Sequence, residues 1–205
     1  FNNVAVAAEH TREALGLERI MIVDFDVHHC NGTQHIFYDR SDVLVMSCHR
    51  YPFYPGTGAL VELGEGEGTG YTVNLPLPAA VGDPTVVAGF EATLLQIAEA
   101  FDPQLILVSA GFDAHLFDPL GGLRMSEAGY GVLMGWLVEA ANRTAAQGRV
   151  VTVLEGGYDL DALSRSMRIC TEIMGGQTPP RLEFGEEDHA LGLVDLYRQT
   201  HEPYW

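Results

Sequence analysis

The sequence predicts an α/β protein with a mostly parallel sheet and helices on both faces. Short apolar runs rich in β-branched residues alternate with longer helix-forming stretches, as right-handed strand–helix–strand crossovers require. Several of these runs end in Asp, His or Gly, at the sheet edge where ligands of α/β proteins bind. The length of 205 residues fits one domain with a sizeable core, and no linker interrupts it, so we treat residues 1–205 as a single domain.

The amino-terminal half begins with an Ala-rich run that predicts a helix over residues 4–16, ended by Gly16. Apolar, β-branched runs then predict three strands, at residues 19–23, 43–48 and 71–75. Residues 32–38 should form a short helix between the first two strands. The Gly- and Pro-rich stretch 51–70 predicts a loop, and its acidic, glycine-rich part 62–70 predicts a flexible turn.

The carboxyl-terminal half repeats the pattern. Pro84 suits the first turn of a helix that should run to about Phe101, whereas Pro76 and Pro78 should lie beyond the third strand. Further strands are expected at residues 104–110 and 149–154, and further helices at residues 126–146, 160–175 and 190–200. Residues 177–188 have the weakest pattern, so we expect the least order there.

The first strand runs directly into the segment 24–29 (DFDVHH). Side chains alternate along a strand, so Asp24, Asp26 and His28 share one face if the extended geometry continues. His29 then points elsewhere, as a hydrogen-bonded or core histidine. Carboxylate and imidazole together suit a divalent transition metal, zinc above all, although capping groups at a strand end would give the same residues.

Two later strands end in similar polar segments. The strand at 104–110 is followed by Gly111-Phe112-Asp113, and the carboxyl ends of parallel strands meet at one edge. Two carboxylates and one histidine would leave a coordination position vacant, which is the catalytic pattern for zinc. The strand at 149–154 leads to Tyr158, whose hydroxyl could serve as an oxyanion donor; this motif alone favours instead a tyrosine that caps the core.

Composition narrows the function further. The formal net charge of −17 argues against direct binding to nucleic acid, while a basic protein tail stays open as a partner. Three cysteines without paired spacing give no disulfide framework, so we expect a reducing, cytoplasmic environment. No apolar stretch reaches the roughly 18 residues that a membrane span needs. The sequence leaves open whether the chain forms a homo-oligomer.

Four motifs resemble one known family. They are the segments 23–33, 54–58, 109–120 and 154–158, and they closely resemble the histone deacetylase superfamily. The similarity is to its class II-like bacterial branch, alongside acetoin-utilisation proteins and acetylpolyamine amidohydrolases. It covers nearly the whole chain and implies an arginase/deacetylase-type α/β fold. It also implies zinc-dependent hydrolysis of acetyl-amide bonds, in acetyl-lysine or in an acetylated polyamine or other small amine.

The resemblance assigns roles to the motif residues. It implies that Asp26, His28 and Asp113 are the zinc ligands. It implies that Tyr158 polarises the acetyl carbonyl and stabilises the tetrahedral oxyanion. Asp24 matches the aspartate that orients a catalytic histidine.

The resemblance also implies two alkali-metal sites and a substrate tunnel. One site, usually for potassium and made partly of backbone carbonyls, matches Asp24, Asp26, His28, Ser47 and Cys48. A second such site matches Phe37, Arg40, Val43 and Tyr71. Tyr54 matches an aromatic wall of the acyl-lysine tunnel, and Leu120 lies near the tunnel's floor or rim.

The chain departs from the family at two places. Cys30 stands where family members usually have Gly, so its side chain could crowd the turn. The family's general-base pair of histidines lies just upstream of the segment that matches Phe1, and the adjacent histidines at 28 and 29 are not that pair. We therefore expect an amino-terminally truncated, partial deacetylase domain that lacks the first strands and is not a competent deacetylase by itself.

Two other functions stay open. A non-catalytic metal-binding or interaction protein of the same fold is favoured if these residues are the natural whole. An arginase-like hydrolase with two manganese ions is disfavoured, because the extra carboxylate ligands that it needs are not evident.

Overall fold

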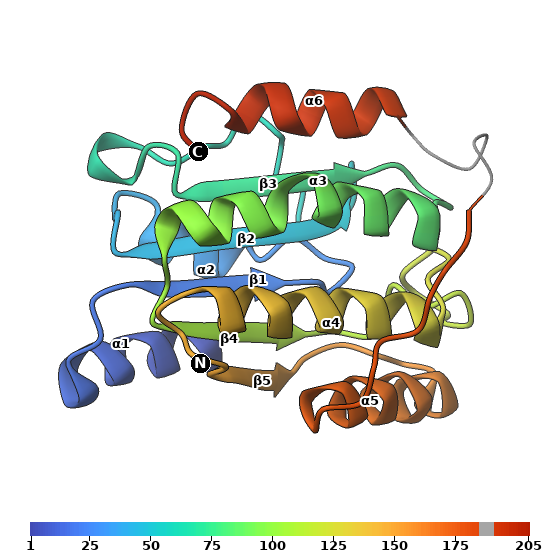
Figure 1. Cartoon of the computed structure of the whole chain (residues 1–205). Coiled ribbons are helices and arrows are strands. Elements are labelled where there is room, and N and C mark those ends of the chain that lie inside the picture. The colour runs from blue at the N-terminus through green and yellow to red at the C-terminus, as the bar shows by residue number, and fades with distance from the viewer. Residues whose placement is uncertain (185–190) are drawn as a thin grey trace.

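The computed structural model describes residues 1–184 and 191–205, and a five-stranded sheet runs through its middle. The strands are β1 (Ile20–Asp24), β2 (Val43–Arg50), β3 (Thr72–Leu77), β4 (Leu105–Ala110) and β5 (Val150–Leu154). Their order is β3-β2-β1-β4-β5, and every neighbouring pair is parallel, so all five arrows point the same way in Figure 1. The predicted parallel α/β fold is confirmed, and the carboxyl ends of the strands share one edge.

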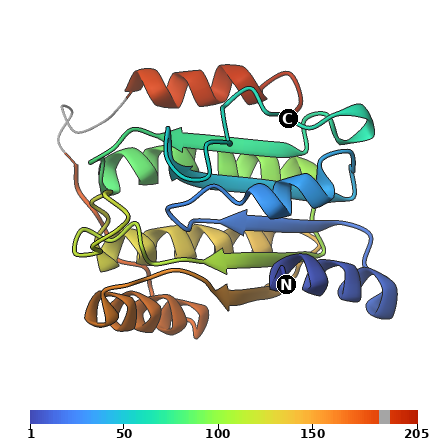
Figure 2. The same ribbon diagram turned by 180° about the vertical axis from the view of Figure 1, so that it is seen from behind.

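Helices cover both faces of the sheet, as predicted. They are α1 (Asn3–Leu15), α2 (Asn31–Phe37), α3 (Asp83–Phe101), α4 (Glu127–Arg143), α5 (Leu160–Met174) and α6 (Leu191–His201). Figure 1 shows α3 and α4 on one face, and Figure 2, turned by 180°, shows α1 and α2 on the other. Helix α6 packs on α3 and α5 packs on α4, so these two helices extend the layer beyond the sheet.

Side chains at the helix ends explain where the helices begin and stop. Asn2 accepts a hydrogen bond from the Ala5 amide at the start of α1, and Ser126 and Asp159 cap α4 and α5 in the same way. Gly16 ends α1 in the left-handed conformation, with φ of 69°, which glycine adopts without steric cost.

The central strands are buried on both sides. Along β1, Met21 and Val23 join the larger core under α3 and α4, whereas Ile20 and Ile22 join the smaller core under α1. This alternation places the polar end of β1 between two apolar layers, and Asp24 is paired in register with Ser47 of β2 and Ser109 of β4. The sheet thus fixes the position at which the polar segment 24–29 begins.

Some details differ from the prediction. Pro76 lies inside β3 rather than beyond it, which is tolerated because β3 is an edge strand and pairs only with β2. Helix α4 ends at Arg143, three residues early. The weakly patterned stretch 177–188 falls partly outside the described residues, as does residue 190 of the predicted last helix. None of the described helices combines the length and apolar character needed to cross a membrane.

Candidate metal centre

The segment after β1 turns instead of continuing the strand. The strand ends at Asp24, whose Oδ1 accepts a hydrogen bond of 2.9 Å from the amide of Asp26. Asp26 Oδ1 in turn accepts a bond of 2.8 Å from the amide of His28. The expectation that extended geometry carries these residues onto one face is therefore wrong. Two successive turns, each held by an aspartate side chain, bring Asp26 and His28 together instead.

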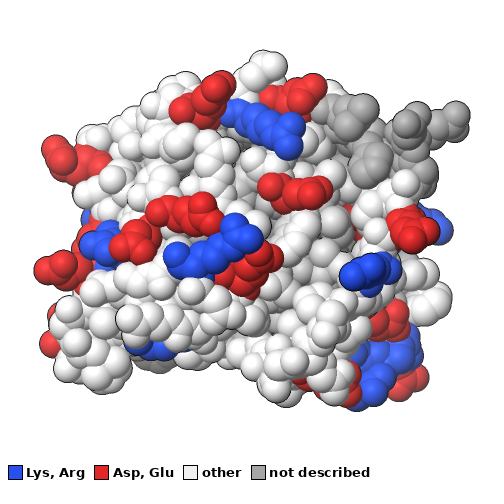
Figure 3. Space-filling model, in the orientation of Figure 1, with Lys and Arg blue, Asp and Glu red and all other residues white. Residues whose placement is uncertain are grey.

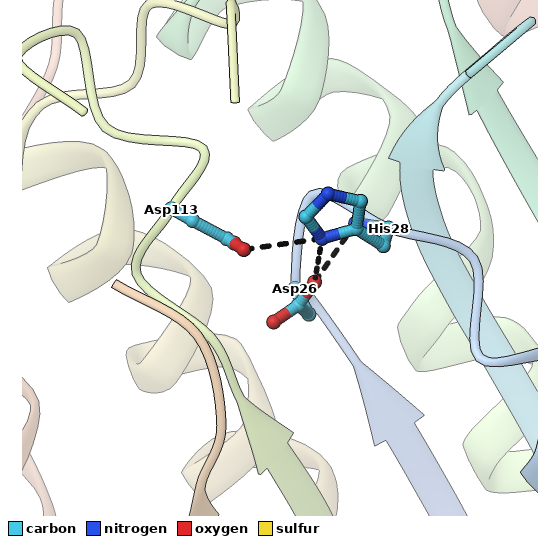
Figure 4. Close-up of side chains that lie close together, drawn as sticks. All are labelled: Asp26, His28 and Asp113. Carbon is cyan, nitrogen blue, oxygen red and sulfur yellow. Dashed lines mark hydrogen bonds and ion pairs between the residues drawn. The ribbon is translucent and has the colours of Figure 1, made fainter. Parts of the chain in front are cut away.

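Asp26, His28 and Asp113 converge at the carboxyl edge of the sheet (Figure 4). His28 Nδ1 lies 2.9 Å from Asp26 Oδ1 and 3.2 Å from Asp113 Oδ2. One ligand atom from each residue lies within 4.8 Å of the other two, close enough for all three to hold one ion. Asp113 arrives from the loop after β4, so two adjacent strands supply the cluster, as predicted.

The donor set fits a metal ion. Asp113 is fully buried; its Oδ1 accepts a bond of 2.8 Å from the Val27 amide, and its Oδ2 has only the contact of 3.2 Å with His28 Nδ1 among the described residues. A buried carboxylate oxygen with so little compensation for lost solvation is costly, and a cation would satisfy it. Two carboxylates and an imidazole are ligands that zinc accepts, and three protein ligands leave a position for a reacting group.

The electrostatics of the cluster favour a positive charge at its centre. Hydrogen bonds with Asp113 and Asp26 raise the pKa of His28 to about 10. Burial raises the pKa of Asp113, and burial together with the neighbouring Asp26 raises that of Asp24. A divalent cation bound among these side chains would neutralise the carboxylates.

Two glycines make room for the carboxylates. A Cβ added at Gly156 would lie 2.3 Å from Asp113 Oδ2 and 2.7 Å from Asp26 Oδ2. A Cβ added at Gly111 would lie 2.3 Å from Asp26 Oδ2. Gly156 also donates its amide to Asp26 Oδ2 at 3.0 Å, which fixes the carboxylate's orientation. Only glycine allows backbone this close to the candidate ligands.

Tyr158 follows Gly156 at the end of the β5 loop. Its side chain is 53% exposed, so it is available to a bound molecule. Partial burial, with the charges of Asp113 and Asp26 adding to it, raises its pKa, and the phenol therefore keeps its proton at neutral pH. A protonated hydroxyl is what an oxyanion donor requires. Its catalytic role stays a prediction.

Aromatic side chains line the approach to His28. The ring of Phe53 stacks on that of His28, with centroids 5.4 Å apart and planes at 15°, and Tyr54 meets it edge-on at 6.0 Å. The guanidinium of Arg50 lies 4.1 Å above the Phe53 ring. The sequence identified Tyr54, which is 75% exposed, but missed Phe53 and Arg50. Phe53 lies in an irregular loop and Arg50 is the last residue of β2, and no periodicity marks either of them.

A buried network of polar side chains holds the loop that carries Phe53 and Tyr54. His29 contacts Thr57 Oγ1 at 2.8 Å and Gln34 Oε1 at 2.9 Å, which confirms the prediction of a hydrogen-bonded core histidine. Glu62 accepts bonds from the amides of Gly58 and Ala59 and from Gln34 Nε2. The stretch 62–70 is thus anchored at Glu62 and contains a short 3-10 helix at Gly66–Gly68, while its flexibility stays a prediction.

The residues of the predicted potassium sites lie on β2 and the segments beside it. Ser47 and Cys48 are buried next to Asp24, and Ser47 Oγ contacts His49 Nδ1 at 2.9 Å. In the second set, the carbonyls of Phe37 and Tyr71 already accept hydrogen bonds from the amides of Arg40 and Val45, while Val43 begins β2. Both potassium sites stay predictions.

Cys30 does not crowd the turn after His29. It precedes α2 with φ of −75°, a value open to any residue, so glycine is not needed there. Burial raises the pKa of its thiol well above the ordinary range. All three cysteines are unpaired, in agreement with the absence of a disulfide framework.

A polar cavity of about 340 Å³ opens beside the cluster. Its lining includes Asn2, Asp24, His28, Asn31 and Glu155. Leu120, which the resemblance placed near the tunnel, is 55% exposed on the loop that follows Asp113. The cluster is thus reachable from outside and is not a sealed structural site.

Comparisons with known proteins point to one family. A profile of the histone deacetylase domain matches residues 1–174. The rice protein "Histone deacetylase 10, chloroplastic" (Oryza sativa subsp. japonica) is 45% identical over 98% of this chain and 45% of its own length. The mouse protein "Polyamine deacetylase HDAC10" (Mus musculus) is 41% identical over all of this chain and 31% of its own length.

Solved structures give the same result. The histone deacetylase Clr3 superposes with a TM-score of 0.91 at 36% identity, over all of this chain and 35% of that one. The HDA15 HD domain superposes with a TM-score of 0.87 at 37% identity, over all of this chain and 55% of that one. The chain spans less than half the length of the two curated relatives named above. The profile match and the shared arginase-like α/β fold show that this chain belongs to the histone deacetylase family.

Proposed function

We propose that this chain is the metal-binding part of a zinc-dependent deacetylase that hydrolyses acetyl-amide bonds. The observation that carries the proposal is the convergence of Asp26, His28 and Asp113 at an accessible sheet edge, with the Asp113 carboxylate fully buried there. Three ligands of these types leave an open position, as catalytic rather than structural zinc sites do.

Each residue has a place in this chemistry. Asp26, His28 and Asp113 would hold the zinc ion, which when bound supplies Lewis acidity toward the acetyl carbonyl and activates water. Tyr158 donates a hydrogen bond to the carbonyl oxygen as negative charge develops there. Phe53 and Tyr54 form an apolar wall beside His28 that shields the reacting amide from bulk water.

The substrate is an acetylated amine, either acetyl-lysine in a protein or an acetylated polyamine or small amine. The net charge of −17 suits a substrate that carries further positive charges, as both classes do. On the face drawn in Figure 3, the described basic side chains lie among acidic ones and form no basic patch. Arg143, for example, pairs with Glu99 and Glu139. A mouse relative carries the name polyamine deacetylase, which supports the small-amine arm.

A non-catalytic metal-binding or interaction protein is the alternative. Of the histidines in the described part of the chain, His28 and His29 line the cavity. His28 belongs to the candidate metal cluster, and both ring nitrogens of His29 already contact Thr57 and Gln34. General-base catalysis therefore needs a residue other than these. In the family resemblance that residue belongs to a histidine pair upstream of Phe1.

The test is a deacetylase assay of the complete gene product, freed of metal and then reloaded with zinc. Acetyl-lysine peptides and acetylated polyamines are assayed in parallel. We expect zinc-dependent acetate release from at least one class, and its loss in Asp113→Asn. Asp161→Asn is the matched control, because Asp161 is exposed and distant from the cluster in sequence. A zinc-loaded protein that hydrolyses neither class would favour the non-catalytic alternative.

A further inference from the structure

Two loops meet at the rim of the metal centre. The first, residues 111–125, carries Asp113 and is closed at its base by bonds between the amide of Leu116 and the carbonyl of Met125, at 2.9 Å, and between the amide of Met125 and the carbonyl of Ala114, at 3.1 Å. The second, residues 155–158, carries Tyr158 from the end of β5. What connects them sets the position of Tyr158 relative to the candidate ligands.

Asp118 joins the two loops through its carboxylate. Oδ1 accepts the amides of Leu120 and Gly121 at 2.8 and 3.0 Å, within its own loop. Oδ2 accepts the amide of Tyr158 at 2.7 Å, across to the other loop. Hydrogen bonds from backbone amides to a charged carboxylate are among the stronger ones in proteins.

The same loop is anchored to a candidate ligand. A Cβ added at Gly121 would lie 1.7 Å from the carbonyl oxygen of Asp113, so these two backbones are in direct contact. The Gly121 carbonyl also accepts a bond of 3.2 Å from Arg50, the residue that covers Phe53. A continuous path therefore runs from Tyr158 through Asp118 and Gly121 to Asp113.

Tyr158 needs such a tether because the preceding residue, Gly157, can adopt many backbone conformations. Gly156 is held by two hydrogen bonds: its amide donates to Asp26 Oδ2, and its carbonyl accepts a bond of 2.8 Å from the Phe112 amide. Gly157 follows with φ of 139°, a region that glycine occupies freely. The bond to Asp118 holds the Tyr158 backbone on the far side of this glycine, while the side chain itself is half exposed.

We propose that Asp118 is a positioning residue that holds Tyr158 toward the Asp26–His28–Asp113 cluster by bridging the two rim loops. The inference rests on the proposed function for its catalytic consequence. Its structural part, the tether between the loops, stands on the geometry alone. Asp118 acts through Tyr158, because its carboxylate binds the amides of Leu120, Gly121 and Tyr158.

One substitution removes the tether selectively. In Asp118→Asn the amide oxygen can keep both acceptor bonds within the loop, since two bonds favour that orientation over one. The amide nitrogen then faces the Tyr158 amide, donor against donor, and the bond across the loops is lost. Asp161→Asn is again the matched control, because it removes an equal charge from the exposed start of α5.

The first readout is hydrogen–deuterium exchange of the metal-free protein. In Asp118→Asn we expect exchange in a peptide covering residues 156–159 to rise by about 10- to 100-fold, the range for losing one bond to a charged acceptor. Peptides from α4 should be unchanged, and so should all peptides of Asp161→Asn. Unchanged exchange at 156–159 would overturn the tether.

The second readout is a double-mutant cycle in the zinc-loaded complete gene product. We expect Asp118→Asn to lower kcat about tenfold or more with little change in KM, and to have almost no further effect when Tyr158 is already Phe. An equal loss in both backgrounds would overturn the positioning role. A wild type without any deacetylase activity would instead contradict the proposed function, which the exchange measurement does not require.

Discussion

Strands β1 and β5 deliver their polar segments to the same edge in opposite ways. β1 lies in the middle of the sheet with all five residues buried, and the segment after it is held by the side chains of its own Asp24 and Asp26. β5 lies at the sheet edge, with Val151 and Leu154 each 48% exposed. The segment after β5 is held by carboxylates from elsewhere, Asp26 and Asp118.

Because of this difference, we expect metal binding and catalytic turnover to respond to different substitutions. The candidate ligands after β1 are held by short-range bonds at a buried strand end, so we expect their arrangement to survive changes at residues that do not touch them. Tyr158 after β5 depends on two long-range bonds, so its position can be lost while the cluster persists. We therefore expect changes on the β1 side to alter metal binding and stability, and changes on the β5 side to alter kcat.

Gly156 is where the two sides touch, and Gly156→Ala should have the largest effect. The added methyl group would displace Asp113 and Asp26, so zinc affinity should fall by more than about 100-fold, beyond the usual loss for an outer hydrogen bond. Activity should vanish with it. Competition with a colorimetric chelator measures the affinity.

Gly192→Ala is the control for this substitution, because a Cβ added there meets nothing within 4 Å. Circular dichroism separates local displacement from unfolding. A folded Gly156→Ala variant with wild-type zinc affinity would break the comparison, since it would place the metal elsewhere.

Tyr158→Phe should have the next largest effect, and on kcat alone. Loss of one oxyanion donor lowers kcat by about 10²–10³. Zinc affinity should be unchanged, because Tyr158 lies outside the ligand set. Steady-state kinetics of the complete gene product, together with its zinc content, measure both quantities; near-normal turnover would remove Tyr158 from the chemistry.

Glu62→Ala should destabilise the β1 side by about 1–3 kcal/mol, through the loss of bonds from Gly58, Ala59 and Gln34 to a charged acceptor. Urea denaturation measures the free energy of unfolding. Glu65→Ala is the control, since Glu65 is exposed on the same loop. If both variants lose the same stability, the network under Phe53 and Tyr54 contributes nothing specific.

Acidification should weaken the same side. Burial, and then the nearby His29, lowers the pKa of His49 to about 4 from its ordinary value of 6.5. The unfolded chain therefore binds the proton first, so stability present above pH 6.5 is lost as the pH falls toward 4. The loss attributable to His49 should be about 1–2 kcal/mol by pH 5.

Thermal unfolding at pH 7, 6 and 5 measures this loss, and His49→Gln should flatten the pH dependence. His10→Gln, at an exposed position, should leave it unchanged. An equal slope in wild type and His49→Gln would show that other groups cause the acid sensitivity.

The sequence was sufficient where a pattern repeats. The apolar runs placed all five strands within a few residues, and the polar ends of two of them gave Asp26, His28 and Asp113. It was insufficient where contacts join distant segments. Phe53 reaches His28 from an irregular loop, and Asp118 reaches Tyr158 from 40 residues away.

Local geometry was also missed where side chains compete with the strand. Alternation predicted that Asp26 and His28 meet on an extended face, but the carboxylates of Asp24 and Asp26 bind the following amides and turn the chain. The three predicted residues do converge, but through a different geometry from the one that alternation predicts. Pro76 was missed for a related reason. Proline lacks a backbone N–H, which ends a strand only where that donor is needed for pairing. Because β3 pairs on one side alone, Pro76 can stay inside it.

Zinc titration of the metal-free protein tests the central claim most directly. Calorimetry should show one zinc ion per chain, with at least tenfold weaker binding in Asp113→Asn and in His28→Ala and no change in Asp161→Asn. A crystal of the loaded protein should place the ion about 2.0–2.2 Å from one oxygen each of Asp26 and Asp113 and from His28 Nδ1. Binding of equal strength in all four proteins, or an ion held by other residues, would contradict the account.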